Sequence, residues 1–322
     1  MKILIIRFSS IGDIVLTTPV VRCLKKQTGA EVHYLTKKSF EKILLSNPYI
    51  DRVLSIEKDV SEVLDILKSM HYDYIIDLHK NFRTLHIKWA LGIKAYSFDK
   101  LNIEKWLMVH FKINRLPDTH IVDRYLATLT AFNISNDNQG LDYFIPKEDE
   151  VNMSQYIENN QPYIAFVIGA AHATKRLPNE KIIEICNQVD YPILLIGGKE
   201  DAVNGDVIIG KTKGNVQNLC GKLNLNQSAS VVQQAHKVIA HDTGLMHIAA
   251  AFRKDIISIW GNTIPEFGMH PYVPNFKENI VEVKGLGCRP CSKIGHEVCP
   301  KGHFKCMNKI NTEEIINIVN IK

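Results

Sequence analysis

The sequence has no long apolar run. No stretch of about 18 apolar residues occurs anywhere in the 322 residues, so we predict no membrane-spanning helix. The first apolar run, Ile3–Ile6, is too short for the core of a signal peptide and is followed at once by Arg7. Short-period repeats and low-complexity tracts are also missing. The composition, 45% hydrophobic and 23% charged, is that of an ordinary globular protein, which we expect to be cytoplasmic.

Charge of either sign is only weakly in excess. The formal net charge is +5, and this mild basicity fits an acidic ligand, a membrane surface or a nucleic acid equally well. The stretch 79–115 is more strongly biased, because it carries eight Lys or Arg residues, including Lys80 and Arg83, against Asp99 and Glu104. This stretch is either a solvated surface or a docking face for an anionic partner.

Apolar β-branched stretches alternate with helical stretches along the chain. They predict strands at 2–8, 31–36, 52–56, 72–78, 163–169, 192–198, 237–242 and 255–261. Such alternation is typical of βα units on parallel sheets, so the fold class is α/β. A polar linker over 145–162 separates a domain at 1–150 from a second at 160–305, and a final helix lies within 306–322. Ligands are expected between the domains, at the carboxyl ends of strands.

A polar cluster follows the first predicted strand. Its members are Ser9, Ser10, Gly12 and Asp13. Gly12 permits an unusual backbone angle or a close approach, and a helix start with exposed N–H groups favours anions. Simple capping is the alternative, because Ser and Asp are preferred residues at helix N-termini.

Two further loops after strands have residues suited to a nucleotide. In GAAHATKRLP (169–178), Thr174 and Lys175 stand among small residues that let a ligand approach the backbone, and the lysine can neutralise phosphate. The alternative is a solvated basic loop. In GGKED (197–201), Glu200 suits the hydroxyls of a ribose. The G-x-G-x-x-G spacing of dinucleotide sites is missing, so this second loop is weak on its own.

The stretch HDTGLMHIAAA (241–251) follows another predicted strand. Asp242, Thr243 and Gly244 stand at a helix start, where backbone amides point at an anion, and His247 falls in the first turn. A packed histidine is the alternative for His247. Four such strand ends are hard to explain by capping alone, and three lie in the second half, which we therefore expect to bind the nucleotide.

Four of the seven cysteines are grouped near the end of the chain. Cys288, Cys291, Cys299 and Cys306 follow the spacing C-x2-C-x7-C-x6-C, which makes a structural zinc site one hypothesis. A packed, reduced loop is the other. Disulfides are not expected in a reducing compartment.

Several motifs together resemble a known family. The opening R-x-S-S-x-G-D-x-x-x-T-x-P, the D-T-G-L-x-H stretch followed by W-G-x-T-x-P (260–265), HKNFR (79–83) and HIVDRYL (120–126) are similar to glycosyltransferase family 9. These are the bacterial heptosyltransferases of lipopolysaccharide core assembly. The resemblance spans nearly the whole chain.

The resemblance implies a GT-B fold, with two Rossmann-like domains whose parallel sheets face a central cleft and a last helix that packs back on the first domain. It also implies inverting, metal-independent transfer from an ADP-heptose-like donor to the lipopolysaccharide core or a related cell-surface glycan. No cofactor is then required for catalysis. The acceptor would be an anionic glycolipid at the inner membrane surface, where the protein would lie peripherally on the cytoplasmic face.

Site residues carry over from the resemblance as follows. Asp13 matches the catalytic base, Lys175 the phosphate contact and Glu200 the ribose contact. The pyrophosphate and sugar contacts match Asp242, Thr243, Gly244 and His247, and Thr174 can assist the leaving diphosphate. The acceptor would meet Ser9, Ser10, Gly12, Lys80 and Arg83.

Two other classes of function compete with this interpretation. One is an NAD-type oxidoreductase on two Rossmann units, against which the missing G-x-G-x-x-G argues. The other is a nucleic-acid-binding zinc protein that uses the cysteine cluster and the positive charge. It leaves Asp13 and the 242–247 motif unexplained, so we expect no nucleic-acid partner.

Overall fold

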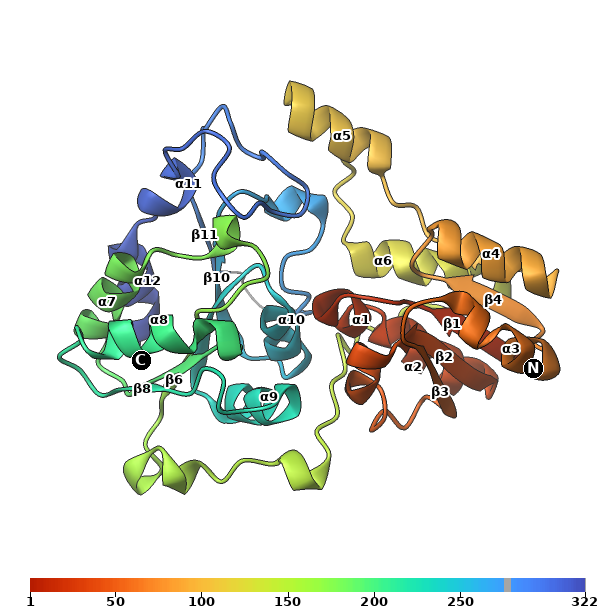
Figure 1. Ribbon diagram of the computed structural model, residues 1–322, viewed down its shortest axis with the longest axis horizontal. Helices are drawn as coiled ribbons and strands as arrows, with labels where there is room; N and C mark the ends of the chain where they lie inside the picture. The colour runs from red at the N-terminus through yellow and green to blue at the C-terminus, as the bar shows by residue number, and fades with distance from the viewer. Residues whose placement is uncertain (275–278, 322) are drawn as a thin grey trace. The chain divides into compact units, whose positions relative to one another are not determined.

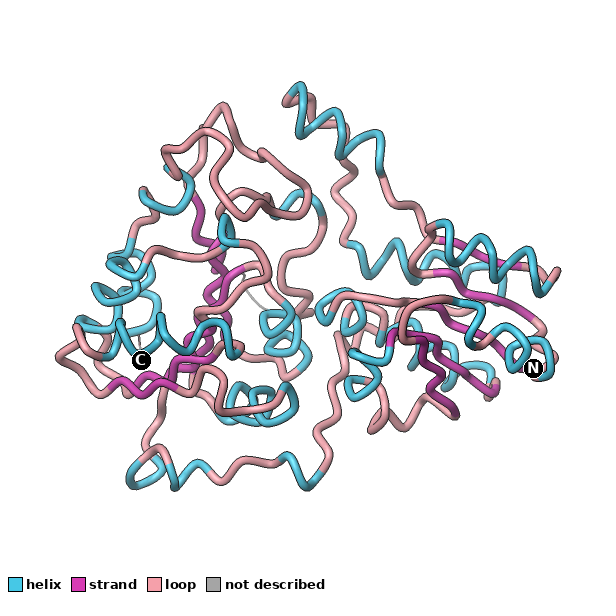
Figure 2. The backbone as a smooth tube through the Cα atoms, in the orientation of Figure 1, coloured by secondary structure: helices cyan, strands magenta, loops and turns pink. Residues whose placement is uncertain are grey.

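The computed structural model describes residues 1–274 and 279–321, which form two compact units. The first unit comprises Met1–Lys100 and Thr119–Phe144, and the second comprises Leu101–Asp118 and Ile145–Lys322. Figure 1 follows both from the red N-terminus to the blue C-terminus, and Figure 2 separates helices from strands. Both units are α/β, as predicted.

The first unit is built on one parallel sheet of five strands in the order β3-β2-β1-β4-β5. The strands are β1 (Lys2–Ile6), β2 (Glu31–Lys37), β3 (Arg52–Ile56), β4 (Tyr74–Asp77) and β5 (Ala95–Ser97). The helices of this unit are α1 (Ile11–Val15), α2 (Thr18–Thr28), α3 (Leu64–Ser69), α4 (Phe82–Leu91) and α6 (Ile121–Leu126). One face of the sheet packs on α3 and α4 through apolar side chains that include Leu4, Ile6 and Ile87.

The second unit has a six-stranded parallel sheet in the order β11-β10-β9-β6-β7-β8. Its strands are β6 (Ile164–Val167), β7 (Ile193–Ile196), β8 (Val216–Asn218), β9 (Lys237–His241), β10 (Asp255–Trp260) and β11 (Asn279–Glu282). Its helices are α5 (Asn102–Phe111), α7 (Asn179–Gln188), α8 (Ala202–Ile209), α9 (Leu225–Gln234), α10 (Gly244–Ala251), α11 (Lys305–Asn308) and α12 (Thr312–Asn320). Ile164 and Phe166 share one core with α7, α8 and α12.

Both sheets change strand order at one position. In the first unit the chain runs outward from β1 through β2 to β3 and then resumes at β4 on the other side of β1. In the second unit the same reversal occurs between β6 and β9. Loops that leave the carboxyl ends of such neighbouring strands diverge, which opens a crevice for ligands. These two switch points are therefore the places to look for sites.

The region after β1 shows how local sequence sets the elements. Two helices follow β1, because α1 ends at Val15 and α2 begins at Thr18. Pro19 stands in the first turn of α2, where its missing N–H costs nothing. Gly29 ends α2 with a left-handed backbone, φ +64°, and its N–H donates to the Lys25 carbonyl at 2.9 Å.

The division into units differs from the predicted continuous domains 1–150 and 160–305, because residues 101–118 group with the second unit. Lys112 Nζ donates to the Pro290 carbonyl at 2.6 Å, and Lys105 Nζ lies 5.9 Å from the centre of the Phe267 ring. These contacts explain the assignment of α5.

The tail helix α12 belongs to the second unit, where it packs beside α7 and β11 with Ile315, Ile316 and Val319 buried. The predicted packing of 306–322 toward the first domain concerns the arrangement of the two units and stays a prediction. Within residues 1–274 and 279–321, no helix has the length and hydropathy needed to cross a bilayer.

Candidate functional site

The loop after β1 forms a closed polar network. Asp13 Oδ1 lies 2.6 Å from Arg7 Nη2, and Asp13 Oδ2 accepts from the Ser10 hydroxyl at 2.7 Å and the Ser10 N–H at 3.1 Å. Ser10 is the N-cap of α1 and Asp13 its third residue, so the pair forms a capping box. The capping interpretation of this cluster is therefore confirmed for Ser10 and Asp13. A role for Asp13 in chemistry is a separate question.

Gly12 and Ser9 complete this loop. Gly12 is buried inside α1 with helical geometry, so the expectation of an unusual backbone angle is not met there. The Ser9 carbonyl accepts from Arg7 Nε at 2.7 Å.

Arg7 is the centre of this network, and the list of site residues from sequence omitted it. It is 8% exposed, and its Nη1 donates to the Leu78 carbonyl at 2.6 Å and to the Tyr125 hydroxyl at 3.1 Å. It therefore ties the loop after β1 to the loop after β4 at the switch point. Burial disfavours the charged guanidinium, but the surrounding groups, Asp13 first among them, together outweigh this effect and the pKa of Arg7 is raised. A charged residue directly after a buried strand was the signal in the sequence.

Lys80 and Arg83 follow β4, the strand beside β1. Both side chains are exposed, and the Lys80 N–H donates to Asp77 Oδ1 at 2.7 Å. Asp77 is fully buried and pairs with Lys88 Nζ at 2.9 Å. Burial opposes ionisation, but these partners hold the pKa of Asp77 below its usual value. The turn is thus fixed from beneath, and the two cations on it face solvent.

In the second unit, the loops after β6 and β9 meet. Lys175 Nζ lies 2.6 Å from Asp242 Oδ2 and 3.4 Å from the Asp242 carbonyl. Thr263, from the loop after β10, donates to the same carboxylate oxygen at 2.9 Å. The structure therefore brings together two residues that the sequence singled out, at the switch point between β6 and β9. Thr263 lies in the W-G-x-T-x-P motif but was not among the predicted site residues.

Thr174 is buried and holds its loop in place. Its hydroxyl lies 3.1 Å from Asn262 Oδ1 and 3.1 Å from the His296 carbonyl, and its N–H donates to that carbonyl at 3.1 Å. The His296 N–H donates back to Thr174 Oγ1 at 2.8 Å. Thr174 thus links the loop after β6 to the cysteine-rich segment.

Two buried polar groups, in the loops after β9 and β10, have no hydrogen-bond partner among the described residues. Thr243 is the N-cap residue, but its hydroxyl makes no capping bond and is buried without a hydrogen-bond partner among the described residues. The Asn262 Nδ2 group is likewise buried without a hydrogen-bond partner among the described residues. Gly244 is the first residue of α10, and His247 is buried in its first turn. Buried polar atoms without partners are costly, so they indicate a place where a ligand supplies the missing bonds.

The turn after β7 places two neighbouring acidic residues in different environments, one exposed to solvent and one buried. Glu200 is exposed, which leaves it available to a ligand. Asp201 is 2% exposed, accepts from the Gly198 N–H at 2.9 Å and lies 3.4 Å from Arg176 Nη1. Burial raises the pKa of Asp201. Asp201 therefore shapes the turn that displays Glu200.

The cysteine-rich segment holds the loop after β10 in place through Arg289. Arg289 donates to the carbonyls of Gly261 at 2.7 Å and Thr263 at 2.8 Å, and pairs with Glu282 at 2.6 Å. Within 288–306, the Cys288 sulfur lies 3.9 Å from His303 Nε2.

The four clustered cysteines are free thiols. Burial raises the pKa of Cys291, and it raises that of Cys306 to about 11. In the described part of the chain, no three His, Cys, Asp or Glu residues are arranged to hold a metal ion. Zinc binding by Cys288, Cys291, Cys299 and Cys306 stays a prediction.

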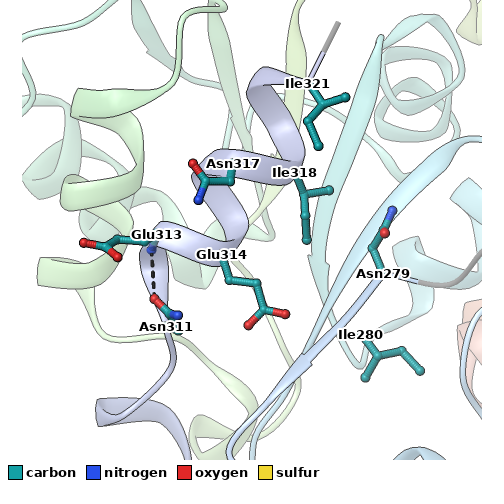
Figure 3. A pocket seen from close by; sticks show the side chains of 8 residues that line it. All are labelled: Asn279, Ile280, Asn311, Glu313, Glu314, Asn317, Ile318 and Ile321. Carbon is teal, nitrogen blue, oxygen red and sulfur yellow. Dashed lines mark hydrogen bonds between the residues drawn. The ribbon is translucent and has the colours of Figure 1, made fainter.

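A hollow of about 490 Å³ lies elsewhere in the second unit (Figure 3). Asn279 and Ile280, at the start of edge strand β11, line it together with α12 residues such as Glu314 and Ile318. This is the edge of the sheet opposite to the carboxyl ends of the strands. The hollow is therefore distinct from the switch-point site, and the residues predicted from sequence do not line it.

Comparison with known proteins identifies the family of this chain. Residues 62–300 match the sequence model of Glycosyltransferase family 9 (heptosyltransferase). The chain belongs to glycosyltransferase family 9. This family 9 protein is therefore a glycosyltransferase, and the oxidoreductase and nucleic-acid alternatives are left without support.

Relatives of this family 9 protein match along almost its entire length. Lipopolysaccharide heptosyltransferase 1 of Campylobacter coli is 26% identical, over 99% of this chain and 98% of its own. The structure of ADP-heptose lipopolysaccharide heptosyltransferase II of E. coli aligns with a TM-score of 0.75 at 19% identity, over 99% and 98% of the two chains. E. coli heptosyltransferase WaaC with ADP aligns with a TM-score of 0.66 at 20% identity, over 87% and 92%. The predicted GT-B fold of two parallel-sheet domains is confirmed.

Proposed function

We propose that this protein is an inverting heptosyltransferase that moves heptose from ADP-heptose to the lipopolysaccharide core. Family membership gives the reaction class. The observation that carries the donor assignment is the contact between Lys175 and Asp242 at the β6–β9 switch point. The adjacent Thr243 hydroxyl has no hydrogen-bond partner among the described residues. Relatives whose names or titles specify heptosyltransferases, one of them with ADP, support the choice of sugar and nucleotide.

The second unit has the chemistry to hold a nucleoside diphosphate. Lys175 supplies one positive charge, and the N–H groups at the start of α10, after Thr243, supply partial positive charge along the helix axis. Both stabilise the negative charge that grows on the departing diphosphate. Asp242 orients Lys175, His247 lies in the first turn for the sugar, and Glu200 is exposed for the ribose hydroxyls.

The first unit supplies the base. The acceptor hydroxyl oxygen forms a bond to the anomeric carbon as the bond from that carbon to the diphosphate oxygen breaks. Asp13 takes the hydroxyl proton, ADP leaves with the electron pair, and the anomeric configuration inverts. The Arg7 and Ser10 contacts fix the direction of the carboxylate.

The acceptor in this proposal is an anionic glycolipid at the cytoplasmic face of the inner membrane. Lys80 and Arg83 are exposed on the turn after β4 and can meet its carboxylates or phosphates, together with the loop at Ser9, Ser10 and Gly12. Replacing both Lys80 and Arg83 with Gln should raise the apparent KM for the acceptor several-fold with little change in kcat. An unchanged KM would remove the acceptor role from this turn.

Thermal unfolding in the presence of millimolar ADP, UDP, GDP or NAD tests the donor assignment. A ligand that binds only the folded protein raises its stability by mass action, so a selective rise in Tm with ADP is expected. A rise with UDP or GDP alone would change the donor. A rise with none of them would contradict the nucleotide site.

Metal content tests the remaining hypothesis for the cysteines. No cofactor is proposed for catalysis. Elemental analysis of protein purified without a metal-affinity tag or a chelator should find close to one equivalent of zinc if the four cysteines hold it. Less than about a tenth of an equivalent would dismiss the site, because structural zinc sites bind tightly.

A further inference from the structure

Helix α4 carries large apolar side chains on its outer face. Phe82 is 91% exposed, Trp89 82% and Leu85 57%. Large apolar side chains that are exposed as a group, rather than singly, mark a surface that meets another apolar phase.

The geometry of α4 puts these three residues in one stripe. They stand at positions i, i+3 and i+7, which an α-helix brings onto a single face. Thr84 and Ile87 point the other way and are fully buried on the core of the first unit. The helix therefore has two apolar faces, and only one of them is needed for folding.

Positive charge borders the outer stripe. Lys80 and Arg83 are exposed at the start of α4, and His86 is exposed within it. Lys88 is committed elsewhere, to the ion pair with Asp77. The sequence of α4, FRTLHIKWAL, contains no acidic residue. An aromatic apolar stripe with a basic border is typical of helices that lie in the interface of an anionic bilayer.

We propose that α4 docks on an anionic lipid bilayer, with Phe82, Leu85 and Trp89 inserted at the boundary between headgroups and acyl chains. Lys80 and Arg83 then contact lipid phosphates. Trp and Phe are suited to this depth because their rings are largely apolar and the indole N–H can bond to headgroups. A lipid surface fits better than an acidic protein, because three large exposed side chains in line need an apolar phase as well as negative charge.

Helix α5, in the second unit, also exposes large apolar side chains, although it contains an acidic residue, Glu104. None of its residues is buried, and Ile103, Trp106 and Phe111 are 71%, 50% and 59% exposed. Arg115 follows it and is exposed. Since α5 belongs to the other unit, it is a second candidate contact and needs its own variant.

This inference deepens the proposed function, on which it rests for the presence of a membrane-bound acceptor. Its test needs neither donor nor acceptor, so the two can fail separately. If vesicles bind the protein but ADP does not raise its Tm, only the donor assignment fails. If ADP raises the Tm but vesicles do not bind, only the docking surface fails.

Vesicle sedimentation tests the role of the stripe. The full-length protein should sediment with vesicles of phosphatidylglycerol and phosphatidylethanolamine, and much less with pure phosphatidylcholine. The variant F82S/L85S/W89S should lower partitioning by roughly tenfold or more, because each side chain loses its apolar transfer. The matched control is Leu45→Ser, since Leu45 is 63% exposed in the same unit and lies outside the stripe. It should bind as the unchanged protein does.

Tryptophan fluorescence then reports insertion directly. The three tryptophans are Trp89, Trp106 and Trp260, and Trp260 is 1% exposed and serves as an internal reference. In W106F, brominated lipids should quench Trp89 and shift its emission to the blue. In W89F, the same lipids report on Trp106 of α5.

Three results would overturn the proposal. The first is equal binding of F82S/L85S/W89S and the unchanged protein, and the second is no quenching of Trp89. The third is concentration-dependent self-association in analytical ultracentrifugation that disappears in the triple variant without any vesicle binding. In that case the stripe is an interface between copies of the chain.

Discussion

The two switch points of this family 9 protein differ in how completely their polar side chains are hydrogen-bonded within the described residues. At the β1–β4 position, Arg7 has four partners, and Asp13 is held from two sides by Arg7 and Ser10. At the β6–β9 position, Lys175 and Asp242 are paired, but the Thr243 hydroxyl and the Asn262 amide nitrogen are buried with no partner among the described residues.

The first switch point thus holds one carboxylate, that of Asp13, in a fixed direction, whereas the second offers polar groups that can still form hydrogen bonds. A base needs a fixed direction, and a network of charged hydrogen bonds supplies it before any substrate arrives. A diphosphate brings many acceptor oxygens, so the groups that bind it are left unsatisfied until it is present. In the proposed function, the same βα architecture therefore serves both roles, and the loop residues decide which one.

The largest expected effect comes from removing the proposed base, Asp13. Asp13→Ala should lower kcat by roughly 10²- to 10⁴-fold, the usual range for general base catalysis, with ADP affinity unchanged. Asp13→Asn should lose as much, although its side-chain oxygen can still accept from Ser10. Calorimetry with ADP and steady-state rates measure both quantities. Near-normal turnover in folded Asp13→Ala protein would falsify the role of Asp13.

The next largest effect is expected on the free energy of unfolding when Arg7, the centre of the network after β1, is replaced. Arg7→Met leaves the partly buried Asp13 carboxylate without its cation, and it removes the hydrogen bonds to the Leu78 carbonyl and the Tyr125 hydroxyl, so the free energy of unfolding should fall by about 3 kcal/mol. The two ion pairs are equally shielded, at 10% and 18% side-chain exposure for Arg7 and Asp13 and at 15% and 11% for Lys175 and Asp242. Lys175→Met should nevertheless cost less, because Lys175 contacts Asp242 alone among the described residues, whereas Arg7 also holds two carbonyls and a hydroxyl. Urea titrations of both variants check the ranking. The reverse order would mean that the number of hydrogen-bond partners does not decide how much each residue contributes to stability.

A smaller effect is expected on nucleotide affinity. Lys175→Met should weaken ADP binding by about ten- to a hundredfold, the range for loss of one charge-assisted hydrogen bond. Lys211→Met is the control, because Lys211 is exposed in the same unit and stands after α8, away from the β6 and β9 loops. Titration calorimetry with ADP compares them, and equal affinities would exclude Lys175 from the donor site.

The smallest effect concerns pH. Burial, aided by Arg7, lowers the pKa of His79 to about 4, and burial, aided by Arg176, lowers that of His241 to about 3. Both stay neutral in the fold but take up a proton in the unfolded chain below about pH 6.5, so acid favours unfolding. Each should cost about 1 kcal/mol of unfolding free energy at pH 5.5. His79→Gln should flatten this acid slope in urea titrations, and an unchanged slope would contradict the buried neutral state.

The central strands were predictable because they are continuous and apolar. β1, β6 and β9 read as β-branched runs, and they carry the loops that hold the site. The edge strands β5, β8 and β11 were missed, since they have only three or four residues each and little burial to enforce a pattern.

Pairing across the sequence was harder to predict than loop composition. Lys175 and Asp242 were both singled out from local residue types, but their contact depends on the strand order of the folded sheet. Tyr125 and Asn262 gave no local signal, because their partners Arg7 and Thr174 are 118 and 88 residues away. Local sequence reveals which polar residues stand at strand ends. Which of them form hydrogen bonds with one another depends on how the fold brings distant segments together.

The assignment of α5 to the second unit has a consequence for the covalent connection between the units. The chain passes from one unit to the other at three places, after Lys100, after Asp118 and after Phe144. A single proteolytic cut within 101–118 leaves the units joined through the passage after Phe144. Neither unit is therefore an uninterrupted segment of gene sequence, and the first can be isolated only by replacing 101–118 with a short linker.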